Sequence, residues 1–332
     1  MRSLALFFLL CISVSCKKKD FLAGFDKRAL FAAPSAVETD AVLNEWQSRN
    51  LTPTGYAVVQ ETPLSDGKYT FKIVSFTVAG IKEYGALIIP KTNTPVPVRV
   101  MISGFSIDHA VTSRIIAIGD NSDQPFILAI PALRGQKLAL TVNGTAYSSP
   151  LSEGKHCDAF DGATDDVIAF LNLIQATENK ADINRTSVRG GSRGGTVALL
   201  AGIRDKRVKA VVNVVGPTDL MALTAVSEND ATYQCQFLDA LVHQQASMAS
   251  TRLKMIASSP LYFADKLPAT QIHMGIKDKN VPIAQGHALQ EEINQSGSGA
   301  AFTFFSYDRG HADMADNNPE LENRIKQFLD QF

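Results

Sequence analysis

Apolar positions along most of this chain follow two patterns that alternate with each other. Short apolar runs bounded by Gly, Pro or Asn predict buried strands, and apolar residues three and four positions apart predict helices. The predicted strands lie at 98–102, 126–130, 186–190, 208–215, 271–276 and 302–306. The predicted helices lie at 161–176, 196–202, 286–293 and 321–328. The alternation predicts an α/β fold with a doubly wound, mostly parallel sheet.

The region before these elements has a strand-like pattern of its own. Two apolar runs at 71–78 and 84–89 are separated by a short turn that contains Ala79 and Gly80. This arrangement predicts a hairpin. Further upstream, residues 21–50 are predicted to form a tether and a short helix with an apolar face made of Ala41, Leu43 and Trp46.

Residues 218–262, here named the cap segment, interrupt the alternation of strands and helices. They contain Met, Gln and Ala at helical spacing and have no strand-like run. This pattern predicts a small helical cap over a functional site, and ordinary surface helices are the alternative.

The N-terminus has the pattern of an export signal. Arg2 precedes a short apolar run at 4–12, which is followed by small residues and then by Cys16. This pattern resembles a bacterial lipoprotein signal, so we expect removal of 1–15 and acylation of Cys16. The expected location is the cell envelope, at the outer membrane or in the periplasm, with the lipid anchor in a membrane. Ordinary secretion with an unmodified Cys16 is the alternative.

Composition narrows the possible functions. The chain has 332 residues, of which 45% are hydrophobic, and its net charge of −1 gives no reason to expect a nucleic-acid partner. We expect one catalytic domain at 69–332, preceded by a lipidated tether and N-terminal helix at 16–68. A domain of this size needs no structural metal, and the cysteines lack metal-ligand spacing. We therefore expect neither a metal nor a cofactor.

Two cysteines remain after the predicted signal and lipidation site are set aside. These are Cys157 and Cys235. In an oxidising compartment they can form one disulfide. Two separate buried thiols are the alternative, and the sequence does not decide between them.

The chemistry of the chain is most visible at residues 190–195, which read Gly-Gly-Ser-Arg-Gly-Gly between a predicted strand and a predicted helix. Strand, G-x-S-x-G and helix in this order are typical of the nucleophile elbow of α/β-hydrolases. The elbow holds the hydroxyl of Ser192 at a sharp turn, where glycine neighbours avoid clashes of Cβ atoms. The amide of Arg193 is then expected to face the oxyanion at a helix N-terminus.

A serine nucleophile needs a base and an acid that orients the base, and in this fold the order is serine, acid, histidine. His311 follows the last predicted strand and is the expected base. Asp278 follows the strand at 271–276 and is the expected acid, which would hold the imidazole tautomer. Asp219 is the rival acid. His273 lies inside an apolar run and is expected to be a packed core residue.

The second oxyanion donor is expected in the loop after the strand at 98–102. Ser103, Gly104 and Phe105 occupy this loop, and the amide of Phe105 is the candidate donor. Loss of one such donor typically lowers the rate by about 10²–10³.

Around these residues the chain resembles the catalytic domain of the prolyl-oligopeptidase family of serine hydrolases. Residues 190–195 resemble that family's G-G-S-Y-G-G, with Arg193 in place of tyrosine, and residues 275–282 resemble its G-x-x-D-x-x-V-P. The resemblance extends over about 69–332. It implies hydrolysis of peptide or ester bonds in small substrates by a triad of Ser192, Asp278 and His311.

The chain also resembles the acetyl xylan esterases, which carry R-G-Q and G-x-S-Q-G. Residues 134–136 match the first motif, and residues 190–194 match the second except at Arg193. The segment 16–68 is too short for the β-propeller that holds peptides in the first family, so the architecture fits an esterase. The local motifs fit the prolyl-oligopeptidase family slightly better, and a carbohydrate acetyl esterase is the alternative. The expected partner is therefore a small molecule, a sugar ester or a peptide. A non-catalytic binding lipoprotein on a hydrolase fold is the alternative of another class.

Overall fold

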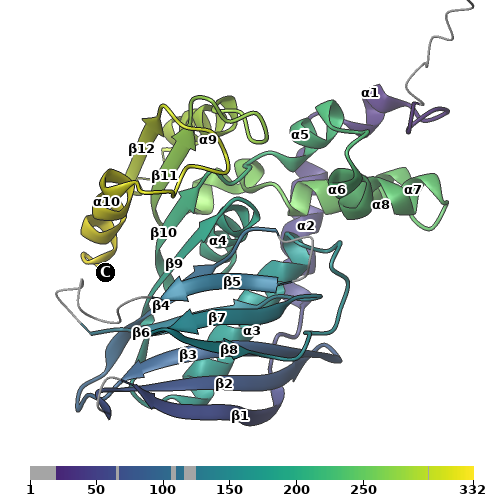
Figure 1. Cartoon of the computed structure of the whole chain (residues 1–332). Coiled ribbons are helices and arrows are strands. Elements are labelled where there is room, and N and C mark those ends of the chain that lie inside the picture. The colour runs from purple at the N-terminus through teal and green to yellow at the C-terminus, as the bar shows by residue number, and fades with distance from the viewer. Residues whose placement is uncertain (1–19, 65–66, 106–109, 116–124, 298) are drawn as a thin grey trace, which may run out of the picture.

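A nine-stranded sheet forms the centre of the molecule (Figure 1). The computed structural model describes residues 20–64, 67–105, 110–115, 125–297 and 299–332. In spatial order the strands are β1 (Thr54–Leu64), β2 (Tyr69–Val78), β3 (Ile81–Pro90), β6 (Ile127–Ala132), β4 (Val96–Ile102), β9 (Ala181–Gly191), β10 (Val208–Val214), β11 (Ala269–Gly275) and β12 (Phe302–Tyr307).

The sheet is antiparallel from β1 to β6 and parallel from β6 to β12. The predicted doubly wound, mostly parallel sheet is therefore confirmed. The predicted hairpin is also present, because β2 and β3 pair antiparallel across a tight turn. In that turn Ala79 has φ 47° and Gly80 has φ 80°, the left-handed geometry that hairpin turns of two residues require.

Helices cover both faces of the parallel half. On one face lie α3 (Asp161–Thr177), α4 (Arg193–Arg204) and α9 (Ala284–Ser296), and on the other lies α10 (Pro319–Leu329). Strand β10 shows the division, because Val211 packs in the first cluster while Ala210 and Val212 pack with α10. Helix α3 begins at Asp161, whose carboxylate pairs with Arg49 at 2.7 Å and does not cap the helix.

A second, three-stranded sheet was not predicted. It consists of β5 (Ala110–Ile115), β7 (Lys137–Val142) and β8 (Thr145–Ser148). Leu138 and Leu140 pack with residues of β2 and β3. Asn143 and Gly144, with φ 48° and 81°, form the turn between β7 and β8. Asn-Gly is the strongest short hairpin signal, so this turn was detectable in the sequence.

The segment predicted as a tether and helix is more ordered than expected. It contains α1 (Lys27–Leu30) and α2 (Ala36–Ser48), and β1 within it pairs with β2, so the sheet begins before residue 69. Trp46 is buried as predicted, but its partner on α2 is Val42, whereas Ala41 is exposed. The reason is geometric, because positions 42 and 46 lie on one helical face.

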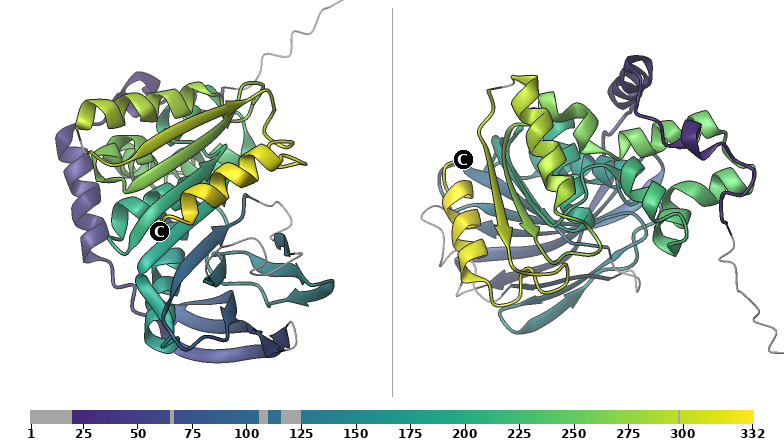
Figure 2. Two further views of the ribbon diagram at one scale, coloured as in Figure 1. Left: turned by 90° about the vertical axis from the view of Figure 1, so that its left-hand side faces the viewer. Right: turned by 90° about the horizontal axis from the view of Figure 1, so that it is seen from above.

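The cap segment is helical throughout most of its length. It contains α5 (Leu220–Val226), α6 (Ala231–Tyr233), a π-helical turn (Gln234–Leu238), α7 (Asp239–Val242) and α8 (Met248–Ala257). These helices lie beyond one end of the sheet together with α1 and α2 (Figures 1 and 2). Leu30, Val42 and Met255 belong to the apolar cluster that joins the two groups of helices. Cys157 and Cys235 form a disulfide, with Cα atoms 5.4 Å apart, that ties the cap segment to the loop before α3.

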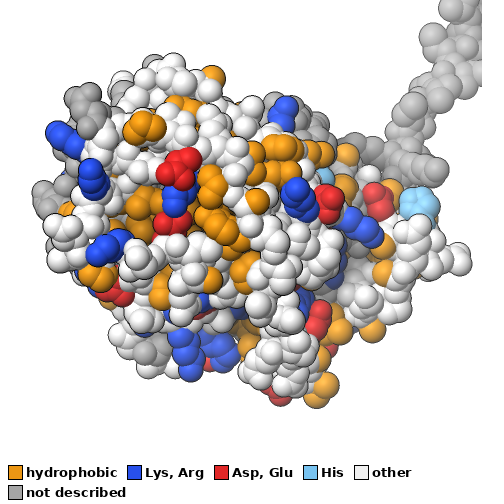
Figure 3. All heavy atoms as spheres, turned by 90° about the horizontal axis from the view of Figure 1, so that it is seen from below, with side chains coloured by type: hydrophobic (Ala, Val, Ile, Leu, Met, Phe, Trp, Pro, Cys, Tyr) orange, Lys and Arg blue, Asp and Glu red, His pale blue; other side chains and the backbone are white. Residues whose placement is uncertain are grey.

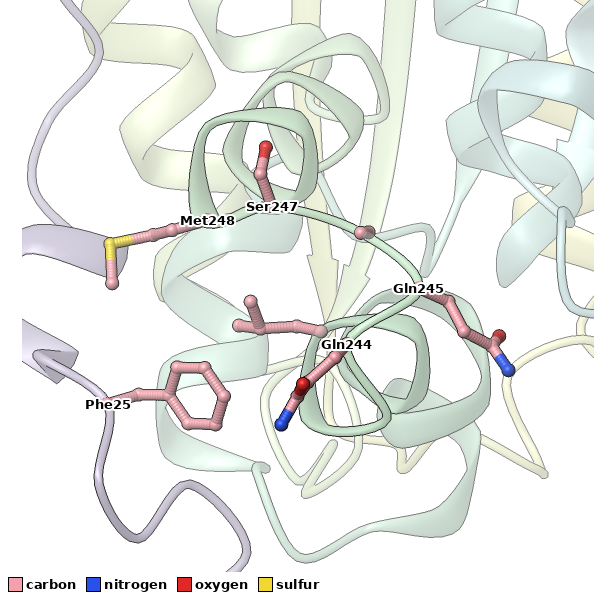
Figure 4. A pocket seen from close by; sticks show the side chains of 7 residues that line it. Phe25, Gln244, Gln245, Ser247 and Met248 are labelled. Atoms are coloured by element: carbon pink, nitrogen blue, oxygen red, sulfur yellow. The ribbon is translucent and has the colours of Figure 1, made fainter.

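Where the N-terminal segment meets the cap segment there is an open pocket of about 450 Å³ (Figure 4). Phe25 lines it from the N-terminal segment, and Gln244, Gln245 and Met248 line it from the region between α7 and α8. Apolar side chains also gather on the face of the molecule seen from below (Figure 3). On β1 the exposed apolar residues are Tyr56, Val58 and Val59.

The predicted signal at 1–15 and Cys16 lie outside the described residues. The signal, the acylation and the location in the cell envelope therefore remain predictions. Among the residues that the structure describes, no helix is long and apolar enough to cross a membrane.

Candidate active site

Ser192 lies at the sharp turn between the end of β9 and the start of α4. Its backbone has φ 53° and ψ −127°, and its amide donates to the carbonyl of Val214 at 2.8 Å. The neighbouring glycines are required for space: a Cβ atom on Gly190 would lie 2.0 Å from the carbonyl oxygen of Gly194. A Cβ atom on Gly195 would lie 2.2 Å from Oδ1 of Asn213. The turn therefore has the strained geometry expected of an elbow.

His311 and Asp278 continue from the serine as a hydrogen-bonded chain. Nε2 of His311 lies 2.8 Å from Oγ of Ser192, and Nδ1 lies 2.7 Å from Oδ2 of Asp278. An ionised carboxylate only accepts, so Nδ1–H donates to Asp278 and leaves Nε2 free to accept the proton of the hydroxyl. The arrangement suits His311 for removing a proton from Ser192.

The acid is held by the turn after β11. The side chain of Asp278 is fully buried, and its Oδ1 accepts from the amides of Asn280 and Val281 at 2.8 Å each. The loop of His311 is also fixed, since the amide of Gly310 donates to Asp313 at 2.8 Å. Both groups are thus positioned by backbone hydrogen bonds.

The rival acid has another role. Asp219 caps α5 by accepting from the amide of Ala222, and it also accepts from the hydroxyl of Tyr262 at 2.9 Å. The structure therefore brings Asp278 to His311. His273 is fully buried, as expected of a core residue, and its nitrogens lie 2.9 Å from the hydroxyl of Tyr307 and 2.8 Å from Oε1 of Gln271.

The two expected oxyanion donors flank the serine. Arg193 is the first residue of α4, so its amide has no partner within the helix. The loop with Phe105 lies directly beside the elbow, because a Cβ atom on Gly104 would be 3.4 Å from Cβ of Ser192. These positions suit two amides that converge on a tetrahedral intermediate.

The side chain of Arg193 packs against the loop after β4. It is buried, and Nη2 donates to the carbonyls of Ser103 and Gly104 and to Oε1 of Gln136. Burial lowers its pKa to about 10, which still leaves the guanidinium charged at neutral pH. Gln136 is the third residue of the R-G-Q motif at 134–136, so the motif contains the side chain that contacts Arg193.

One residue of the cap segment, Tyr233 on α6, is influenced by the charge of the candidate acid. Burial raises the pKa of Tyr233 well above its usual value, and the charges of Asp230 and Asp278 raise it further. Tyr233 therefore lies within electrostatic range of the acid. Sequence analysis missed this residue, since its position depends on packing between distant segments. The ring of Phe105, in the loop after β4, packs against that of His156, with 4.4 Å between the ring centroids.

The groups brought together at the site are a carboxylate, an imidazole and a hydroxyl, from Asp278, His311 and Ser192. Within the described ranges, no group of three or more His, Cys, Asp or Glu is arranged to hold a metal ion. The expected absence of a metal or cofactor remains a prediction.

A comparison with protein families gives a match over part of the chain. The BD-FAE family model matches residues 158–293, a span that includes Ser192 and Asp278 and ends before His311. No match to a curated protein is found.

Solved structures resemble the chain at low sequence identity. Acetyl xylan esterase 1 from Thermoanaerobacterium sp. JW/SL YS485 has a TM-score of 0.63 and 16% identity, covering 89% of this chain and 93% of its own. The acetyl xylan esterase from Paenibacillus sp. R4 has a TM-score of 0.60 and 17% identity, covering 91% and 96%. The acylaminoacyl peptidase from Pyrococcus horikoshii has a TM-score of 0.54 and 15% identity, covering 79% of this chain and 40% of its own.

Proposed function

This chain has the α/β-hydrolase fold, and from that premise we propose that it is a serine hydrolase that cleaves ester or amide bonds of small substrates. Ser192 attacks the carbonyl carbon while His311 takes its proton, and Asp278 stabilises the imidazolium. The amides of Arg193 and Phe105 hold the oxyanion. His311 then protonates the leaving group, and water releases the acyl group from Ser192. The observation that carries the proposal is the hydrogen-bonded chain from Asp278 through His311 to Ser192.

One comparison supports an ester over a peptide as substrate. The two acetyl xylan esterases match over 93% and 96% of their own length, whereas the acylaminoacyl peptidase matches over 40% of its length. The matched part of that peptidase is therefore less than half of it. A carbohydrate acetyl ester is the candidate substrate class, and a peptide bond is the second candidate.

The test compares a small acetate ester with a peptide amide of matched acyl group, in the wild type and in Ser192→Ala. We expect kcat/KM for the ester to fall by roughly 10⁴–10⁶ in the variant. A serine-reactive fluorophosphonate should label the wild type and leave the variant unlabelled.

The matched control is Ser48→Ala, since Ser48 is exposed at the end of α2. Its labelling should persist. Ester hydrolysis that survives in Ser192→Ala would refute the proposal, and comparable cleavage of the amide would favour a peptidase. A folded wild type that is neither labelled nor active would favour the non-catalytic binding protein.

A further inference from the structure

The guanidinium of Arg193 lies among neutral acceptors beside the elbow. The residue is 3% exposed, and Nη2 lies 3.1 Å from the Ser103 carbonyl, 3.0 Å from the Gly104 carbonyl and 2.8 Å from Oε1 of Gln136. Within the part of the chain that the structure describes, its Nε has no hydrogen-bond partner. Asp166, which is paired with Arg134, acts on Arg193 only through longer-range electrostatics. A buried cation is costly unless it is solvated by such dipoles. This one is held by the loop of the second oxyanion donor.

The carbonyl of Gly104 and the amide of Phe105 belong to the same peptide unit. A trans peptide is planar, so its C=O and N–H point in opposite directions. The described chain contains no cis peptide bond. When the Gly104 oxygen is fixed on Arg193, the direction of the Phe105 N–H is therefore fixed as well.

The same contact also changes the strength of the donor. A charged donor on a carbonyl oxygen draws electron density toward it and makes the N–H of that peptide a better donor. The effect is largest where water is excluded, and the Arg193 side chain is buried. The peptide of Gly104 and Phe105 would then bind an oxyanion more tightly than a peptide solvated by water.

We propose that the side chain of Arg193 positions and polarises the second oxyanion donor, while its backbone amide is the first donor. One residue thus controls both sides of the oxyanion hole, and its side chain is a positioning group. The inference rests on the proposed serine hydrolase function. It concerns the position at which this chain departs from both motifs that it resembles, which have Tyr or Gln after the serine.

The test measures whether Arg193 acts on the transition state. In Arg193→Met, kcat for a small acetate ester should fall by about 10²–10³, as for loss of one oxyanion donor. The KM should stay within about threefold, because the Phe105 amide binds the oxyanion only in the transition state. The inhibition constant of a trifluoromethyl ketone, whose adduct carries an oxyanion, should rise by the same factor as kcat falls.

Two further variants support the measurement. Arg193→Lys keeps the charge, but a single ammonium lacks the planar fork that serves three acceptors, so an intermediate fall in kcat of about tenfold is expected. Arg189→Met is the matched control, since Arg189 lies on β9 and pairs with Glu322 at the surface. Its kcat should equal that of the wild type. Melting temperatures show which variants are folded.

A folded Arg193→Met with kcat within threefold of the wild type would overturn the proposal. So would a raised KM with unchanged kcat, which would assign Arg193 to substrate binding. If the Met variant does not fold, a wild-type kcat in Arg193→Lys would be equally decisive. If neither variant folds, Gln136→Glu is the test, because its carboxylate would draw the guanidinium of Arg193 away from the Gly104 carbonyl. The kcat should then fall with KM unchanged, and a wild-type kcat would overturn the proposal. Activity that survives in Ser192→Ala would instead refute the proposed function itself.

Discussion

The parallel half of the sheet and the cap segment are held in place by different kinds of contact. In the sheet, each candidate catalytic side chain follows a strand: Ser192 follows β9, Asp278 follows β11 and His311 follows β12. Because these strands are parallel and in register, the loops after them meet at one edge of the sheet. The backbone ladder thus sets the positions of all three residues.

Among the described residues, the cap segment has no backbone ladder to the sheet and is held by side chains, both by the apolar cluster that contains Leu30, Val42 and Met255 and by polar contacts. Arg252 on α8 pairs with Glu38 on α2 at 2.7 Å and donates to three carbonyls between Ala29 and Ala32. The disulfide of Cys157 and Cys235 adds a covalent link. The contrast teaches that changes at the strand ends should affect chemistry and leave the fold intact, whereas changes in the cap segment should affect stability first.

The largest effect is expected at the acid. Asp278→Asn should lower kcat by about 10⁴, because an amide favours the wrong imidazole tautomer. The melting temperature should change little, since Oδ1 of Asn can still accept from the amides of Asn280 and Val281. Asp308→Asn is the control, because Asp308 is exposed and pairs with Lys277. A fall in kcat of less than tenfold would remove Asp278 from the triad.

The second effect is on stability and concerns the disulfide between Cys157 and Cys235. The paired cysteines are 78 residues apart, so replacing both by Ser should lower the free energy of unfolding by about 4 kcal/mol. Denaturant unfolding measures the loss, and wild type treated with dithiothreitol should match the double variant. The kcat for a small ester should stay within about threefold. A folded double variant with a much lower kcat would contradict the view that the cap segment affects stability and the strand ends affect chemistry.

The smallest effect is on the pH dependence of stability, and it comes from His273 on β11. Burial lowers the pKa of His273 to about 3, whereas in the unfolded chain it is about 6.5. Between these values only the unfolded state binds the proton, so stability falls as the pH falls through that window. His273→Asn should therefore lose about 2 kcal/mol less than the wild type between pH 7 and pH 5. Unfolding curves at the two pH values check this, and equal losses would contradict it.

Much of the parallel half could be predicted because residue types alone carry its pattern. Buried strands need uninterrupted apolar runs. The elbow needs glycine at position 194, because a Cβ atom there would lie 2.4 Å from the Ile102 carbonyl oxygen. The predicted fold class is confirmed, and the structure brings Ser192, His311 and Asp278 together. Their catalytic roles await the tests above.

The rest depends on contacts that residue types do not specify. A long arginine side chain can reach many partners, and those of Arg193 include two backbone carbonyls, which every sequence contains. The influence of Asp278 on Tyr233 depends on how the cap segment packs. The strand β1 was missed because most of its side chains are exposed, so it lacks the apolar alternation of a half-buried strand.

The elbow also has a consequence for how the molecule folds. Ser192 and His311 touch across 119 residues of chain, and Arg193 touches Gly104 across 89. Contacts of such long range form slowly, because large loops must close before they are made. Recovery of activity during refolding should therefore lag behind recovery of helical signal. A partly folded chain would contain every group of the site and yet perform none of the proposed hydrolysis.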